Sequence, residues 1–342
     1  MKVLFAASPA IAIPSLKALC NINDIELVGV LTNPDTAKGR SGALLPTEVG
    51  EAAEELLAVS NKKFTILKPF KLDADAREQV AALKPDLLVS FAYGRLFGPK
   101  FLSLFPLGGI NIHPSLLPKY RGPSPIQAAI LNRDTETGIS IQTLAQEMDS
   151  GDIIDVKYLQ IMKGETTLSL SQRVSQEAAL MLPDIFIKLK DIIGFASDAL
   201  SIKNALYSAG FTVQNNSDAS YCKLFSRKDA VIDWKKSALE IDAAVRAFNP
   251  PPFCRTIHKE KELLILEACA LDDFAQVDLQ RNGNLPTGEP GKVLGTDENY
   301  GILIQTGDGI LAVTKLQYQN KKAHFWRDFL NGALEFPGSQ LG

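Results

Sequence analysis

The amino-acid sequence predicts two domains: a doubly wound α/β domain with a mainly parallel sheet over residues 1–193, and a domain of short strands over residues 221–342. Three observations predict this division. Short apolar runs alternate with helical stretches through the first half, as in βαβ units. Residues 194–220 are rich in Ser, Asn and Ala and are expected to form a linker. The length of 342 residues suits two domains of roughly 100–200 residues each.

The first domain is predicted from the order and apolarity of its segments. Its expected strands are residues 2–6, 26–31, 64–67, 86–91, 109–113, 139–145 and 153–161. Helical stretches separate the first four strands, at residues 13–20, 47–58 and 74–83. A long helix should follow Thr166, because Leu170, Val174, Ala178 and Met181 form one apolar stripe at helical spacing. A sheet covered by helices on both faces is Rossmann-like.

The second domain is predicted to be a small barrel or sandwich. Its expected strands are residues 254–258, 263–268, 291–294, 301–306 and 310–316. Helices are expected at residues 236–248 and 323–330. Short strands separated by Gly- and Asn-containing turns are typical of such folds.

Composition excludes several classes of protein. The net charge of −3 argues against a broadly basic nucleic-acid coat, and 46% hydrophobic residues argue against disorder. No apolar run reaches the roughly 18 residues of a membrane span. Four scattered cysteines, none in a CxxC pair, indicate reduced thiols in the cytoplasm. Only three histidines are present, far apart in the sequence, so we expect no metal site.

The N-terminus and the first turn allow further exclusions. Lys2 and the apolar residues that follow could begin a signal peptide, but Pro9 and Pro14 favour a strand, a turn and a helix. The turn after the first strand contains no glycine, so a dinucleotide fingerprint is missing. The patterns of a P-loop, a nucleophile elbow and a zinc protease are also absent from the sequence.

One segment carries most of the chemical information. A predicted strand ends at Asn111-Ile112-His113, and Pro114 stops it. Strand alternation places Asn111 and His113 on the same face, at the carboxyl end where open α/β sheets bind ligands. Taken alone, this pair could merely cap the strand and satisfy backbone groups.

The longer motif resembles the signature of the folate-dependent formyltransferases. The string Asn-Ile-His-Pro-Ser-Leu-Leu-Pro at residues 111–118 is followed by Tyr-Arg-Gly and Pro-Ile-Gln, and residues 147–152 resemble the family's acidic loop. Residues 92–94 resemble the strand end beside the pterin. Segments of the second half, at residues 232–234, 246–250 and 306–311, resemble the OB-like C-terminal barrel of the members that act on initiator methionyl-tRNA.

The resemblance implies specific roles. Asn111, His113 and Asp149 would be catalytic, with Asn111 and His113 donating hydrogen bonds to the oxyanion and Asp149 orienting His113. Folate would lie along Ser115, Leu116, Leu117 and Pro118, and Phe91, Ala92 and Tyr93 would line the pterin side. The tRNA contacts would include Lys38 and Arg40 in a Gly-flanked loop, and Lys321 and Lys322. The formyl donor would be 10-formyltetrahydrofolate, with no metal, and the protein would be a cytoplasmic monomer.

Alternatives remain at this point. A formyltransferase acting on a nucleotide-linked amino sugar would share the three catalytic residues, and a non-catalytic RNA-binding protein could use the same scaffold. The basic residues could be ordinary surface charge. Two positions depart from the pattern: Pro114 stands where many tRNA enzymes have glycine, and Ile11 where they often have an aromatic residue.

Overall fold

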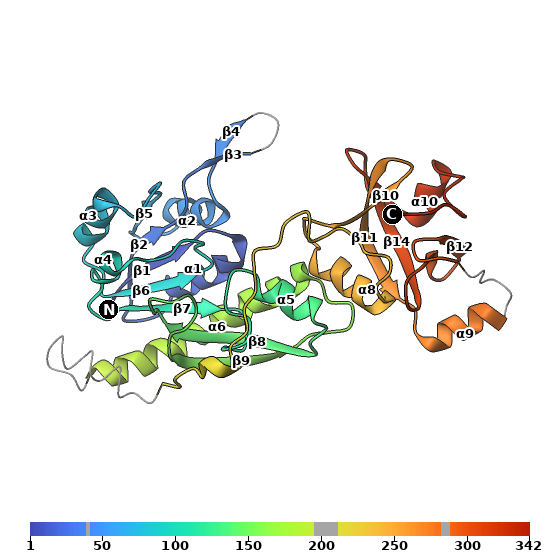
Figure 1. The fold of residues 1–342 in the computed structure, drawn as a ribbon. Helices are drawn as coiled ribbons and strands as arrows, with labels where there is room; N and C mark the ends of the chain where they lie inside the picture. Colours follow the sequence, from blue (N-terminus) through green and yellow to red (C-terminus); the bar gives the residue numbers. More distant parts are fainter. Residues whose placement is uncertain (39–41, 195–210, 282–287) are drawn as a thin grey trace. The chain divides into compact units, whose positions relative to one another are not determined.

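The computed structural model describes residues 1–38, 42–194, 211–281 and 288–342. The chain forms two compact units (Figure 1). The first consists of residues 1–125, 136–160 and 171–223, and the second of residues 126–135, 161–170 and 224–342.

The first unit is built on a seven-stranded sheet (Figure 1). The strand order is β5 (Thr65–Leu67), β2 (Glu26–Leu31), β1 (Lys2–Ala7), β6 (Leu87–Phe91), β7 (Gly109–His113), β8 (Glu136–Thr143) and β9 (Ile153–Gln160). The pairs from β5 to β7 are parallel, whereas β7–β8 and β8–β9 are antiparallel. The prediction of a mainly parallel α/β sheet is therefore confirmed.

Apolar burial holds this sheet. Every residue of β6 is buried, as expected for a central strand of a parallel sheet. Among the described residues, the first unit holds α1 (Ile13–Leu19), α2 (Glu48–Val59), α3 (Ala74–Ala82), α4 (Pro99–Leu102) and most of α6 (Thr167–Gly194), and a 3-10 turn, η1 (Ala10–Ala12), precedes α1. All of α5 (Pro125–Leu131) except Pro125 lies in the second unit. The Thr47 hydroxyl accepts a hydrogen bond from the Gly50 amide at 3.0 Å and so caps the start of α2.

The segment predicted as a basic loop contains two short strands instead. β3 (Thr36–Lys38) pairs antiparallel with β4 (Ala43–Leu45). Three-residue strands are too short to show an alternating pattern, so they could not be predicted from the sequence. The predicted tRNA contact Arg40 lies outside the described residues, and Lys38 ends β3.

The predicted linker, 194–220, is described only in part, because residues 195–210 lie outside the described ranges. Its later residues belong to the first unit. Thr212 and Ile153 exchange two backbone hydrogen bonds, of 2.8 and 2.9 Å. The Arg121 amide donates to the Ser220 carbonyl at 2.8 Å. Residues 211–223 therefore follow the surface of β9 and of the loop after β7.

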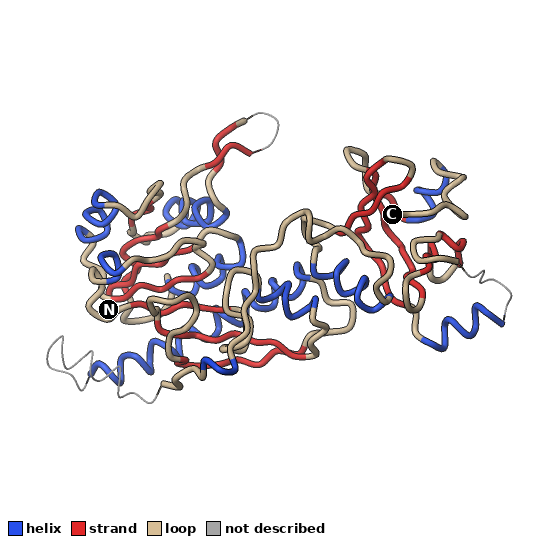
Figure 2. Tube along the Cα trace, viewed as in Figure 1, coloured by secondary structure: helices blue, strands red, loops and turns tan. Residues whose placement is uncertain are grey.

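The second unit contains an antiparallel sheet with accompanying helices (Figure 2). The strands are β10 (Cys254–His258), β11 (Lys261–Ala270), β14 (Ile310–Tyr318), β13 (Gly301–Gln305) and β12 (Val293–Asp297) in that order, with β15 (His324–Phe325) beside β14. In the described residues after 224, the helices are α8 (Ala238–Ala247), α9 (Asp273–Arg281) and α10 (Trp326–Asn331). The predicted second domain of short strands is confirmed, whereas α9 was not predicted.

Within the ranges that the structure describes, no helix combines the length and apolarity needed to cross a membrane.

Candidate active site

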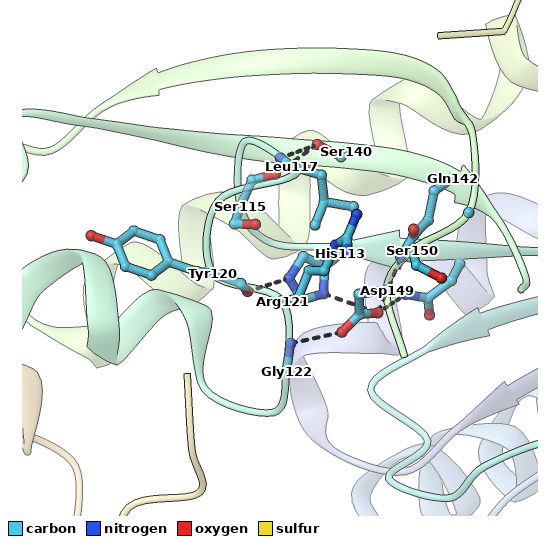
Figure 3. A network of polar contacts seen from close by, with 12 residues as sticks. His113, Ser115, Leu117, Tyr120, Arg121, Gly122, Ser140, Gln142, Asp149 and Ser150 are labelled. Atoms are coloured by element: carbon cyan, nitrogen blue, oxygen red, sulfur yellow. Dashed lines mark hydrogen bonds and ion pairs between the residues drawn. The ribbon is translucent and has the colours of Figure 1, made fainter. Parts of the chain in front are cut away.

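Two polar side chains leave the carboxyl end of β7. Asn111 lies opposite Gln142 of the neighbouring strand β8, and His113 lies opposite Ser140. The Ser140 hydroxyl donates to the Ser115 carbonyl at 2.7 Å and accepts from the Leu117 amide at 3.0 Å (Figure 3). The loop after β7 is therefore fixed to the adjacent strand, as a preorganised site requires.

Asp149 reaches the same place from the turn between β8 and β9. Asp149 has a positive φ of 53°, a conformation that costs a non-glycine residue roughly 1–2 kcal/mol. Nearby, Gly151 passes so close to β8 that a Cβ atom on it would lie 1.8 Å from the Thr143 carbonyl oxygen. Only glycine fits there, so the sequence Asp-Ser-Gly turns the carboxylate back toward β7.

Three hydrogen-bond donors and one ring nitrogen converge on the Asp149 carboxylate (Figure 3). Oδ1 lies 3.0 Å from Gln142 Nε2, 3.3 Å from Asn111 Nδ2 and 3.5 Å from His113 Nδ1. Oδ2 accepts from the Gly122 amide at 2.9 Å. The side chain is 12% exposed. The three residues predicted to be catalytic are thus brought together from strand β7 and from the turn between β8 and β9, and Asn111 and Asp149 are 38 residues apart in sequence.

His113 is held at both ring nitrogens. Nε2 lies 2.9 Å from the Tyr120 carbonyl oxygen, to which it donates, and Nδ1 faces Asp149. The residue is 4% exposed. Asn111 is half-buried, and its amide has one N–H directed at Asp149 and a second for another partner.

The residues predicted to bind folate differ in exposure. Ser115 and Leu117 are buried, and the Ser115 hydroxyl donates to the Lys119 carbonyl at 2.6 Å. Leu116 and Pro118 are half-buried and so present part of their surface. Of the four loop residues predicted to bind folate, Leu116 and Pro118 are therefore the ones with accessible surface.

The strand end predicted to line the pterin side also has one exposed residue. Phe91 and Tyr93 are buried in the first unit, and Tyr93 stacks on Phe97 at 5.4 Å between ring centroids. Burial raises the pKa of the Tyr93 phenol. Between them, Ala92 is exposed and has a positive φ of 51°. A ligand here would meet Ala92 and the backbone.

The predicted tRNA contacts are placed separately. Lys38 ends β3 in the first unit, whereas Lys321 and Lys322 follow β14 in the second unit, where both are exposed.

Comparison with known proteins also indicates a formyltransferase. Residues 1–186 match the formyl transferase family, and residues 225–334 match the formyl transferase C-terminal domain family. A methionyl-tRNA formyltransferase of Treponema denticola is 43% identical over 338 residues, which cover 98% of each chain. One from Borrelia hermsii is 35% identical over 99% of each chain. The chain belongs to the methionyl-tRNA formyltransferase family.

Solved structures share the fold at lower sequence identity. WlaRD, a sugar 3N-formyl transferase, has a TM-score of 0.58 and 19% identity, covering 94% of this chain and 99% of that one. HypX from Aquifex aeolicus in complex with tetrahydrofolic acid has a TM-score of 0.56 and 16% identity, covering 98% of this chain and 48% of that one. These likenesses concern the fold alone.

Arg121 was quoted only within the Tyr-Arg-Gly motif and given no role, and Gln142 and Gln214 were missed altogether. Arg121 is 1% exposed, and Gln142 lies on β8 facing Asp149. Gln214 stands in the predicted linker, where no local pattern distinguishes it. Of these residues, only Gln142 could have been suspected of a role in the site. It lies on the strand next to β7, directly opposite Asn111.

One thiol lies close to the site. The Cys222 sulfur accepts from the Ser124 amide at 3.3 Å, and a Cβ atom on Gly122 would lie 2.3 Å from the Cys222 carbonyl oxygen. Burial raises the pKa of the Cys222 thiol, with a smaller contribution from the charge of Asp149. A thiol in this state is a poor nucleophile, so the geometry assigns Cys222 to packing.

Proposed function

We propose that the protein transfers the formyl group of 10-formyltetrahydrofolate to the α-amino group of methionine carried by initiator tRNA. The observation that supports this most directly is the meeting of Asn111, His113 and Asp149 at the carboxyl end of β7, in a chain whose full-length relatives are methionyl-tRNA formyltransferases. A shared folate-type donor agrees with the family match over residues 1–186.

In the proposed reaction, the amine attacks the formyl carbon and the carbonyl oxygen becomes an oxyanion. The C–N bond to N10 then breaks, N10 takes a proton, and the attacking nitrogen loses one. We assign the oxyanion contact to the second N–H of Asn111, since the first is directed at Asp149. One such donor is worth about 3 kcal/mol in comparable sites.

Asp149 would hold its neighbours in place, and His113 would transfer a proton. Because both Asp149 oxygens already accept hydrogen bonds, we propose that the carboxylate holds Asn111 and His113 in place. His113 would move a proton only after its ring exchanges the Tyr120 carbonyl for a substrate group, since both nitrogens have protein partners. Proton transfer of this kind contributes typically ~10²–10⁴-fold.

The two substrates would approach from different elements. Folate would contact Leu116 and Pro118, with Ser115 and Leu117 shaping the loop from within, and the backbone at residues 91–93 would lie on the pterin side. The tRNA would be held by Lys38 and Arg40 on one unit and by Lys321 and Lys322 on the other. A role in translation initiation would place the protein in the cytoplasm, and we propose that it acts as a monomer.

An acceptor competition tests the proposal. The purified chain is incubated with 10-formyltetrahydrofolate and either methionyl-tRNA or a nucleotide-linked amino sugar, and formylated product is measured. We expect formylation of methionyl-tRNA. Formylation of the sugar alone would support the alternative enzyme, and tight binding of tRNA without any transfer would support the non-catalytic RNA-binding protein.

A paired charge removal tests the tRNA contacts of the second unit. In the double variant Lys321→Gln with Lys322→Gln, we expect a several-fold higher KM for tRNA, an unchanged kcat, and a salt dependence of binding that is shallower by about 1.5 log units per log unit. The control is Lys17→Gln with Lys63→Gln, which removes two exposed lysines of the first unit. Equal effects of the two double variants would remove the assignment of Lys321 and Lys322.

A further inference from the structure

Gln214 links residues 211–223 to the loop that carries Asp149. The side chain is 7% exposed. Its Nε2 lies 2.9 Å from the Asp149 carbonyl oxygen, 2.6 Å from the Gly151 carbonyl oxygen and 3.1 Å from Gln142 Oε1. The two N–H bonds of this amide are therefore shared among three acceptors, two of which belong to the turn between β8 and β9.

Arg121 sets the orientation of that amide. Gln214 Oε1 accepts from Arg121 Nε at 3.0 Å and from Nη2 at 2.8 Å. A guanidinium has donors only, so it faces the oxygen of Gln214 and turns the nitrogen toward the Asp149 turn. Asn216 Oδ1 accepts a further bond from Arg121 at 2.9 Å, and the Tyr221 ring lies 6.0 Å from the guanidinium carbon. Burial makes an unpaired guanidinium costly, so this arrangement is strongly specified.

The same orientation continues to the carboxylate. Because Gln142 Oε1 accepts from Gln214, Gln142 Nε2 faces Asp149 Oδ1, at 3.0 Å. Gln214 thus acts on Asp149 in two ways: it binds the backbone carbonyl of Asp149, whose φ is unfavourable, and it fixes Gln142, a donor to the side chain. A turn with an unfavourable φ persists only when its surroundings over-determine it.

We propose that Gln214 is a positioning residue for formyl transfer, which fixes the Asp149 turn through its side-chain amide while Arg121 holds the amide in the required orientation. The reaction itself rests on the proposed function. Gln214 touches neither Asn111 nor His113 in any contact described above, so its effect reaches them through Asp149. Misplacing a reacting or orienting group by about 1 Å can cost about 10²-fold in rate.

Two substitutions separate this role from simple filling of space. Gln214→Glu keeps the shape and the oxygen that accepts from Arg121, but replaces the donor with an oxygen facing the Asp149 and Gly151 carbonyls. Gln214→Met keeps the approximate size, and it removes both the oxygen that accepts from Arg121 and the N–H groups that face the Asp149 and Gly151 carbonyls. The matched control is Gln305→Met, because Gln305 is a half-buried glutamine of the second unit whose amide donates to the Thr306 and Gly309 carbonyls.

The first measurement is amide hydrogen exchange of residues 145–152 in the full chain without substrates. We expect exchange at least tenfold faster in Gln214→Glu and in Gln214→Met, and unchanged in Gln305→Met, with thermal unfolding confirming that each variant is folded. Exchange at the wild-type rate in Gln214→Glu would overturn the proposal. Glutamate keeps the acceptor for Arg121 and the size of the side chain, so this result would show that the hydrogen bonds donated by Gln214 do not hold the turn.

The second measurement is steady-state formylation. We expect kcat to fall at least tenfold in both Gln214 variants, with the KM values for tRNA and folate within about threefold of wild type, since Asp149 orients groups used in the transition state. A full kcat in Gln214→Glu would contradict the proposal. Failure of the proposed function would instead appear in the wild-type chain as absent formylation, and hydrogen exchange would still decide the role of Gln214.

Discussion

His113 and His258 are equally buried, at 4% and 3% exposure, yet they lie in opposite chemical surroundings. His113 is placed among oxygen atoms, with the Tyr120 carbonyl at one ring nitrogen and Asp149 at the other. His258 is placed among rings: Phe336 lies 4.8 Å away, edge to face, and Tyr318 stacks at 6.1 Å between centroids. Its Nδ1 lies 2.5 Å from the Tyr318 hydroxyl, and among the described residues its Nε2 has no hydrogen-bond partner.

The difference shows that burial by itself does not indicate a catalytic histidine. A histidine that handles protons needs polar partners that fix its ring, and the Tyr120 carbonyl and Asp149 do this for His113. Burial in an apolar setting disfavours the charged ring, and it lowers the pKa of His258. We therefore assign His258 to the core of the second unit, in agreement with its position far along the sequence from the motif at residues 111–118.

The largest effect is expected from changing the polar residues around Asp149, which distinguish the surroundings of His113 from those of His258. We expect His113→Ala and Asn111→Ala each to lower kcat by ~10²–10⁴-fold with the fold retained, because each removes a group of the Asp149 cluster. The measurement is formylation of methionyl-tRNA, with circular dichroism as the test of folding. The matched control is His258→Gln, for which we expect kcat within about twofold of wild type. Near-normal turnover in an Asn111 or His113 variant would remove that residue's role.

A smaller effect is expected from the turn that holds Asp149. Gly151→Ala places a methyl group against the Thr143 carbonyl oxygen, so the turn must shift, and we expect a loss of about 1–3 kcal/mol in unfolding free energy together with lower activity. Gly98→Ala is the control, since a Cβ atom there meets nothing within 4 Å. Denaturant unfolding measures the free energy of unfolding of both variants, and the formylation assay measures their activity. Equal stability of the two variants would show that the turn adapts without cost.

The smallest effect concerns the pH dependence of the second unit. The unfolded chain binds a proton at His258 near the ordinary pKa of 6.5, whereas the folded protein does so only at lower pH. The contribution to stability is therefore complete above pH 6.5 and is lost as the pH falls toward the folded pKa, with a slope below about 1.4 kcal/mol per pH unit. We expect His258→Gln to remove this part of the slope.

Tryptophan fluorescence during urea unfolding at pH 7 and pH 5 measures that slope, because both tryptophans, Trp234 and Trp326, lie in the second unit. His324→Gln is the control, since His324 is exposed. A slope that stays the same in His258→Gln would show that burial of this ring does not govern the titration.

Sequence reasoning predicted the larger elements because their patterns are local. The strands now seen as Leu87–Phe91 and Gly109–His113 were expected at residues 86–91 and 109–113, and the stripe after Thr166 became α6. The hairpin of β3 and β4 was missed because three-residue strands show no period. α9 was missed as well. It is nine residues long and lies between acidic residues and an Asn-Gly turn signal, so the whole stretch resembles a polar loop in the sequence.

The sequence by itself determined which chemistry the chain carries. Asn111 and His113 are two residues apart on one strand, so they share a face whatever else the chain does, and the motif that follows them is continuous. Only the tertiary structure decided what holds Asp149. Arg121 and Gln214 are 93 residues apart, and Gln214 and Gln142 are 72 apart. Periodicity reports which side of an element faces inward, whereas the pairing of polar groups between distant segments depends on how those segments pack.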